Sequence, residues 1–126
     1  MGALEQAQGH LRKAQEFLEA GELTLDLGMF DAATSSAVHS GINSKDAICL
    51  KLTGTTGKSQ NHNDASAELR KAGRKAAAVA DDLKRLIAAK PKAEYQSIAM
   101  ARSEAAKAVE RARRLYNAAL EIVTTN

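Results

Sequence analysis

Basic side chains and one histidine gather around a polar segment near the middle of the chain. Residues 53–63 are dominated by glycines, hydroxyls and amides, and no helical spacing of apolar residues crosses them. Lys58 and His62 lie in this segment, and Arg70 and Arg74 follow it. Side chains of these types contact the phosphate groups of nucleotides and RNA. We therefore predict these four as ligand-binding residues.

The basic run after the polar segment reads Arg70-Lys71-x-x-Arg74-Lys75. On a helix, Arg70 and Arg74 share one face because they are one turn apart, as do Lys71 and Lys75. No aromatic residue interleaves with the run to stack on bases, which argues against a dedicated single-strand binding surface. An ordinary solvated helix face is the alternative explanation.

Two further arrangements contain residues able to move protons. His62 could act as a general acid or base near neutral pH, or simply as a turn residue. His39 and Asp46 are seven positions apart on a predicted helix, so Asp46 could orient His39 as a catalytic base. The same pair could instead satisfy polar partners inside the fold. With Cys49 these residues show no metal-ligand spacing, and no metal or other cofactor is predicted.

Residues 54–59, Gly-Thr-Thr-Gly-Lys-Ser, superficially resemble a phosphate-binding loop. Leu52 stands where that motif requires its first glycine, and the segment follows a predicted helix rather than a strand. Without the strand, nothing aims the backbone amides at phosphates. We expect a surface connection, in which Lys58 could still contact an anion.

The elements that must position these residues are helices. Three stretches carry apolar or small residues alternating three and four apart, a spacing that places them on one helix face. The first stripe is Leu4, Ala7, Leu11, Ala14, Leu18, Gly21 and Leu25; the second is Ala65, Leu69, Ala72, Ala76, Val79, Leu83 and Leu86; the third is Ile98, Ala101, Ala105, Ala108, Ala112, Leu115, Ala119 and Ile122. The pattern predicts an all-α fold, an antiparallel up-and-down bundle.

Four long helices are expected, over about 3–27, 30–52, 64–90 and 93 to the end of the chain. Asp31 is expected to cap the second helix, and Pro91 to end the third. Gly73 is expected to break the third helix, which leaves a short extra helix after the polar segment. The second helix is apolar or small nearly all round and is therefore expected at the centre.

Composition bounds the class of protein. The 126 residues suit a single domain, 1–126, and its core must be built from aliphatic residues because the chain has two phenylalanines, two tyrosines and no tryptophan. A second subunit would cover apolar surface that such a core leaves exposed and would stabilise the fold. We therefore expect a homodimer. One cysteine fits a reducing compartment, and no apolar run approaches the ~20 residues of a membrane span. A soluble, cytoplasmic protein without membrane association is expected.

Charge is unevenly divided along the chain. Residues 1–57 carry four Lys/Arg and seven Asp/Glu, a net −3, whereas residues 58–126 carry fourteen and eight, a net +6. The second half is suited to an anionic partner. Mutual attraction of the two halves within the fold explains the division equally well.

Five short segments together point to a known family: Ala14-x-x-Phe17-Leu18-x-x-Gly21, Phe30-Asp31-Ala32-Ala33, Lys45-Asp46-Ala47-Ile48, Asn61-His62-Asn63-Asp64 before a helix with Leu69, and Lys92-Ala93-Glu94-Tyr95. Through them the chain resembles the HEPN domains, helical bundles of bacterial toxin–antitoxin and defence systems. The resemblance implies a four-helix bundle, usually dimeric. Many catalytic members are metal-independent ribonucleases that use an arginine followed, after four to six residues, by a histidine.

This chain departs from that catalytic pattern. Its histidines are His10, His39 and His62, and no arginine lies five to seven positions before any of them. We therefore expect a non-catalytic HEPN-like module that binds nucleotide or RNA. The alternatives are a metal-independent ribonuclease that acts in a dimer cleft through His62, or through His39 with Asp46, and a structural partner of a nucleotidyltransferase-like protein.

Overall fold

The computed structural model describes residues 1–58 and 62–125, apart from the side chains of residues 62 and 63. Within these residues the chain forms helices and no strand, which confirms the all-α prediction. The helices are α1 (Ala3–Asp26), α2 (Phe30–Thr53), α3 (His62–Ala72), α4 (Arg74–Ala77), α5 (Ala80–Glu94) and α6 (Arg102–Thr124).

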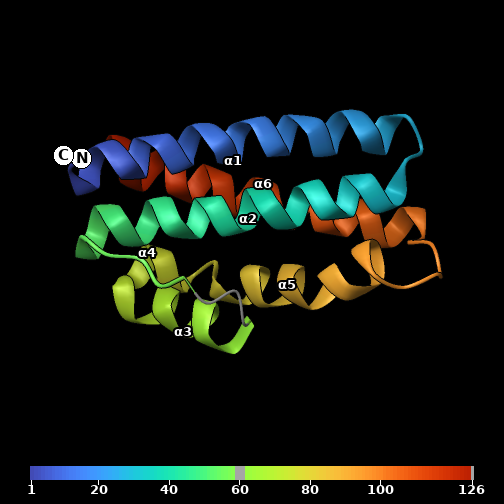
Figure 1. The fold of residues 1–126 in the computed structure, drawn as a ribbon. Helices are drawn as coiled ribbons and strands as arrows, with labels where there is room; N and C mark the ends of the chain where they lie inside the picture. The colour runs from blue at the N-terminus through green and yellow to red at the C-terminus, as the bar shows by residue number, and fades with distance from the viewer. Residues whose placement is uncertain (59–61, 126) are drawn as a thin grey trace.

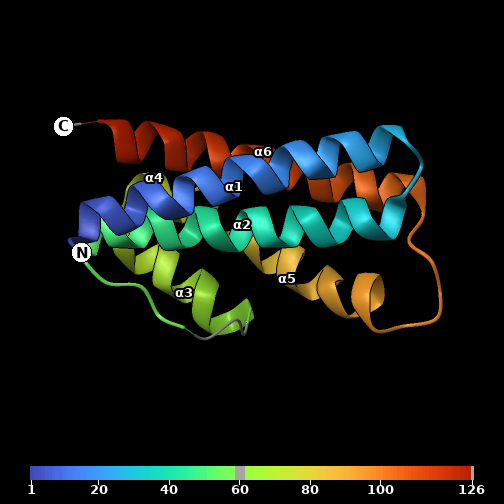
Figure 2. The ribbon, with the colours of Figure 1, turned by 45° about the horizontal axis from the view of Figure 1, so that its top comes forward.

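Four of these helices make the bundle. Successive members α1, α2, α5 and α6 run in opposite directions, and α3 with α4 lies to one side, near the end of the bundle where α2 finishes (Figure 1). The turned view shows the same order and places both chain termini at that end (Figure 2). The first two helices have nearly the predicted boundaries.

Helix α2 is the central element, as its composition predicts. It contacts α1, α6, α5 and α3, and half of its 24 residues are buried. The bundle closes tightly on it through small side chains. The hydroxyl of Ser40 donates to the Ala14 carbonyl oxygen of α1 at 2.8 Å, and Gly41 faces Leu86 and Leu115 with no room for a side chain.

The predicted third helix is three helices in the structure. The chain breaks at Gly73 between α3 and α4, and again at residues 78–79 before α5. The predicted apolar stripe nevertheless stays largely inside, because Leu69, Leu83 and Leu86 are all buried. The break at Gly73 confirms the prediction, whereas the break at residues 78–79 was not predicted.

The predictions that Pro91 ends the third helix and that the last helix begins near residue 93 are wrong. The Pro91 carbonyl accepts from the Tyr95 N–H at 2.9 Å, so α5 continues through one more turn. Glu94 is held there by the hydroxyl of Ser35, at 2.9 Å from Oε2. Losing one amide donor near a helix end is tolerated where other contacts hold the turn.

Residues 95–101 form an irregular connection in place of the predicted start of the last helix. Asp31 does not cap α2; its Oδ1 accepts instead from the Met100 N–H at 2.8 Å. Glu104 Oε1 accepts from the Ala101 N–H at 2.9 Å, which fixes the start of α6. Ile98, expected on the buried stripe, is consequently 66% exposed.

Candidate functional site

A cavity of about 630 Å³ opens between the N-terminal half of α1, the second half of α2 and the polar segment that follows it. Apolar and polar residues line it. The apolar ones are Ile42, Leu50, Ala65, Leu83 and Ile87; the others are Gln6, His10, Lys45, Asp46 and residues 54–58. Small-molecule sites in proteins typically have this size and this composition.

Lys45 is the buried charge in the wall of this cavity. Its side chain is only 3% exposed. A lysine is almost never buried unless acidic or polar groups pair with its charge. The ammonium Nζ lies 2.6 Å from Glu68 Oε1 and 3.3 Å from Asp46 Oδ1, and it donates to Thr56 Oγ1 at 2.9 Å and to the Gly57 carbonyl at 3.1 Å. One side chain of α2 thus holds the polar segment and α3 together.

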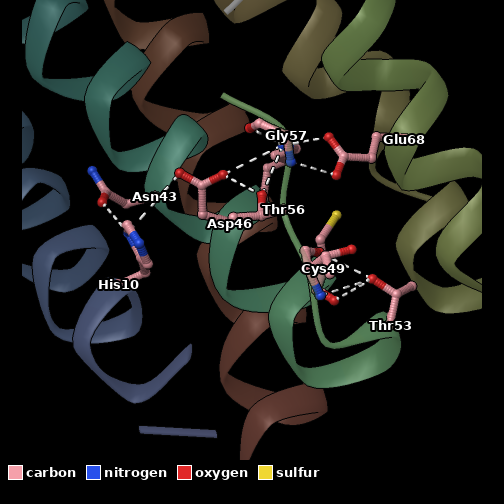
Figure 3. Close-up of polar contacts among 10 residues, drawn as sticks. His10, Asn43, Asp46, Cys49, Thr53, Thr56, Gly57 and Glu68 are labelled. Atoms are coloured by element: carbon pink, nitrogen blue, oxygen red, sulfur yellow. Dashed lines mark hydrogen bonds and ion pairs between the residues drawn. The ribbon is translucent and has the colours of Figure 1, made fainter. Parts of the chain in front are cut away.

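Two carboxylates accept hydrogen bonds from the polar segment and hold it in place. Glu68 Oε2 accepts from the Gly57 N–H at 2.8 Å, and Asp46 Oδ1 accepts from the Thr56 hydroxyl at 2.6 Å (Figure 3). Partial burial raises the pKa of the Glu68 carboxyl, but donation from Lys45 and from the Gly57 N–H outweighs burial, so the pKa is lower than usual. A carboxylate therefore takes the amide that a phosphate-binding loop would offer to its ligand.

His10, from α1, faces this cluster with a defined ring orientation. Its Nδ1 lies 2.9 Å from Asn43 Oδ1 and 3.9 Å from Asp46 Oδ2 (Figure 3). The Asn43 amide nitrogen donates to the His39 carbonyl at 2.9 Å, so its oxygen must face His10. Nδ1 is therefore the donor in the hydrogen bond to Asn43 Oδ1.

Cys49 lies behind the cluster, fully buried. Burial raises the pKa of its thiol to about 11, against the opposing effect of the Lys45 charge, while the charges of Glu68 and Asp46 raise the pKa further. The group is a neutral thiol at neutral pH and supplies neither a nucleophile nor a metal ligand.

The predicted ligand-binding residues are only partly brought together. Lys58 is exposed and lines the cavity, whereas the side chain of His62 lies outside the described residues. Arg70 and Arg74 are both exposed, but the first lies on α3 and the second begins α4 beyond the break at Gly73. A single continuous helix face, as the sequence predicted, does not carry them.

The predicted His39–Asp46 pair does not form a contact. His39 packs against the ring of Phe17 at 5.3 Å, and its Nε2 lies 3.7 Å from Glu94 Oε2. Asp46 is engaged instead by Lys45 and Thr56. The histidine beside Asp46 is His10, which comes from another helix, with Nδ1 3.9 Å from Asp46 Oδ2.

Five basic residues elsewhere in the second half of the chain form ion pairs, whereas Lys84 and Lys107 are exposed without one among the described residues. The ion pairs are Lys75 with Glu121, Arg85 with Asp81, Lys92 with Glu104, Arg113 with Glu22 and Glu110, and Arg114 with Asp82. In the described part of the chain, Lys58, Lys71 and Arg74 make no such pair, and Arg70 donates to the neutral hydroxyl of Ser66 at 3.3 Å. We call the surface formed by Lys58, Arg70, Lys71 and Arg74 the basic surface.

Sequence reasoning missed the role of His10 and of Lys45. One signal for Lys45 was present, since it and Asp46 are the only charges between residues 32 and 50 of an otherwise apolar and small-residue helix. A charge in such a helix must be buried with a partner. No local signal identifies His10, because its partners lie 33 and 36 positions away.

Comparison with known proteins bears on the whole chain. None of the described helices is both long and apolar enough to cross a membrane. A search of curated proteins finds no match. A sequence model of the HEPN domain matches residues 7–123, which confirms the resemblance drawn from the short segments. The chain belongs to the HEPN domain family.

Proposed function

We propose that this HEPN domain is a non-catalytic module that binds a phosphate-bearing ligand, nucleotide or RNA, through the basic surface. The observation that carries the proposal is the basic surface itself. Its four cations are exposed, and none of them has a carboxylate within ion-pair distance among the described residues. Exposed, unneutralised cations supply the electrostatic attraction for phosphates.

The domain is proposed to be non-catalytic because its candidate bases lack the cationic partner that cleavage would need. Phosphodiester cleavage needs a fixed cationic donor beside the base, to stabilise charge on the phosphate. No arginine precedes a histidine at the family's catalytic spacing, and Lys45, the cation nearest to Asp46, is consumed by internal partners. The site therefore supports binding better than cleavage.

The test measures binding of a fluorescein-labelled single-stranded RNA by anisotropy over a range of salt concentrations. The Arg70→Ala/Arg74→Ala variant should bind more weakly, with a log–log salt slope reduced by about 1.4, since each lost phosphate contact removes ~0.7. The matched control is Arg85→Ala/Arg113→Ala, which removes two charges that are already paired. Its binding should stay within about twofold of wild type.

Equal effects of the two double variants would assign any binding to overall charge and remove the basic surface from consideration. The same RNA, incubated with pure protein and a chelator, tests the absence of catalysis. Cleavage that survives the chelator and disappears in His62→Ala or His10→Ala would contradict a non-catalytic role.

We also propose that the domain is a homodimer. Several large apolar side chains are exposed on this chain, among them Leu23, Leu27, Met29, Tyr95 and Ile98. Covering them with a second subunit would remove apolar area from water. Light scattering coupled to size exclusion should give twice the 13.4 kDa mass of the chain; a monomer at micromolar concentration would refute the proposal.

A further inference from the structure

The cavity beneath residues 54–58 has a chemistry that phosphate binding does not use. Part of its lining is aliphatic and comes from the largely buried side chains of Leu50, Leu83 and Ile87. Lys58 belongs both to the lining of the cavity and to the basic surface. A ligand that contacts the basic surface through phosphate can thus place a neighbouring apolar group in the cavity.

Asp46 offers that group one available carboxylate oxygen. Its Oδ1 already accepts from Thr56 at 2.6 Å and from Lys45 at 3.3 Å, which occupies both lone pairs. Its Oδ2 has no hydrogen-bond donor among the described residues, and its nearest charged neighbour is the His10 ring at 3.9 Å. The His10 Nδ1–H is directed to Asn43, so it does not satisfy this oxygen.

The other polar side chains that line the cavity include Gln6, His10, Thr55 and Lys58. Lys45 cannot donate to a ligand, since its three protons are shared among four acceptors. Asp46 Oδ2 therefore favours a ligand that presents an N–H donor at this point of the cavity, beside the apolar lining.

We propose that the cavity is a specificity pocket for an unpaired guanine base, with Asp46 as the residue that determines the choice. The inference rests on the proposed function, since the phosphate of the same nucleotide would contact Lys58. Guanine presents two adjacent donors, N1–H and the 2-amino group, on its pairing edge, whereas adenine and cytosine present a ring-nitrogen acceptor next to their single amino group. Asp46 Oδ2 repels such an acceptor atom where guanine would place a donor.

Lys45 makes Asp46 suitable for this role. The buried ammonium and the Thr56 hydroxyl hold one carboxylate oxygen in place, so the other is oriented before the ligand arrives. A fixed, ionised acceptor forms a charge-assisted hydrogen bond, which is roughly twice as strong as a neutral one. Selectivity follows because a ligand without the donors leaves this oxygen unpaired.

Isothermal titration calorimetry with single nucleotides tests the proposal on the unaltered protein. GMP should bind at least about tenfold more tightly than AMP, the value of one hydrogen bond to a charged group. IMP, which lacks the 2-amino group, should fall between them. 1-methyl-GMP, whose N1 donor is blocked, should lose most of the GMP preference. Because only the ligand changes, no folding defect can imitate this result.

Variants then locate the recognition. Asp46→Asn should reduce the GMP-to-AMP ratio to near one, whereas Asp26→Asn, the same chemical change, should keep it. Asp26 is exposed and lies about 24 Å from His10 along α1 at 1.5 Å per residue. Circular dichroism of Asp46→Asn checks its folding, and the 1-methyl-GMP comparison stands independently of it.

The outcomes separate this inference from the proposed function. If GMP, 1-methyl-GMP and AMP bind equally and with salt dependence, the specificity pocket is refuted and phosphate binding stands. If neither RNA nor any nucleotide binds, both are refuted. Preference for GMP that persists in Asp46→Asn would also overturn the role of Asp46.

Discussion

Lys45 Nζ and Glu68 Oε1 lie 2.6 Å apart and join the central helix of the bundle to α3. The lysine is buried and the glutamate is about one-third exposed, so the pair closes the polar segment at the border between core and solvent. A second carboxylate, that of Asp46, shares the same ammonium. Removing the lysine would leave two neighbouring carboxylates with no cation between them.

Lys45→Met is therefore expected to lower the free energy of unfolding by about 3 kcal/mol, the lower end of the range for breaking a buried ion pair. Urea denaturation followed by circular dichroism measures the change. Lys51→Met is the matched control, since Lys51 lies on the same helix and is half-buried without an ion pair among the described residues. Its effect should stay within ~0.5 kcal/mol, and similar losses in both variants would contradict the account.

The Glu68 carboxylate predicts a specific acid sensitivity. Its folded pKa lies below the ordinary value of 4.5, so its contribution to stability is fully present above that pH and is lost as pH falls through the lower, folded pKa. The stability difference between wild type and Glu68→Gln should thus be constant from pH 7 to about pH 5 and shrink below it. Urea midpoints at each pH provide the measurement. A difference that grows on acidification would reverse the sign and refute the assignment.

Cys49 should resist thiol reagents in the folded protein. Burial raises its pKa to about 11, so the reactive thiolate is scarce at pH 8, and the sulfur is also shielded from solvent. A colorimetric disulfide reagent should react slowly with native protein and quickly with one equivalent after urea is added. Rapid reaction without denaturant would show that the thiol is accessible.

Gly41 marks the closest approach between helices, and an added methyl group should be destabilising there. A Cβ at Gly41 would lie 2.6 Å from Leu86 Cδ1 and 3.3 Å from Leu115 Cδ1, both in the core. We expect Gly41→Ala to cost about 1–3 kcal/mol through overpacking. Gly9→Ala, where the nearest atom is a mobile Arg12 nitrogen at 3.8 Å, should instead stabilise by roughly 0.5–1 kcal/mol. Thermal melts of both variants measure the two changes in stability. Changes of the same sign in both variants would contradict the packing argument.

The sequence was a good guide wherever one local rule acts alone. Apolar spacing predicted α1 and α2 nearly to the residue, because a repeated apolar face must be buried and glycine at residue 28 follows the end of α1. The same spacing failed at Ile98, which continues the stripe but lies in the connection before α6. The hydrogen bond from Met100 to Asp31 joins residues 69 positions apart, and no local pattern contains it.

The candidate site shows the same division. Lys58 and Arg70 could be predicted as exposed cations from the polar and charged sequence around them. That prediction requires no knowledge of which residues contact them. The orientation of His10 in the cavity depends on Asn43, whose amide is oriented by the His39 carbonyl and whose oxygen accepts from His10. Such a chain of contacts across two helices appears only once they are packed.

The position of Lys45 also determines which part of the molecule can unfold locally. Helix α3 has 11 residues, and helices of fewer than ~12–15 are marginal on their own. Its amide protons are protected while Leu69 stays in the core and Glu68 stays on the ammonium of Lys45. Loss of both attachments lets α3 unfold as a unit of its own, so its hydrogen exchange follows a sub-global opening while α2 still exchanges with the whole bundle.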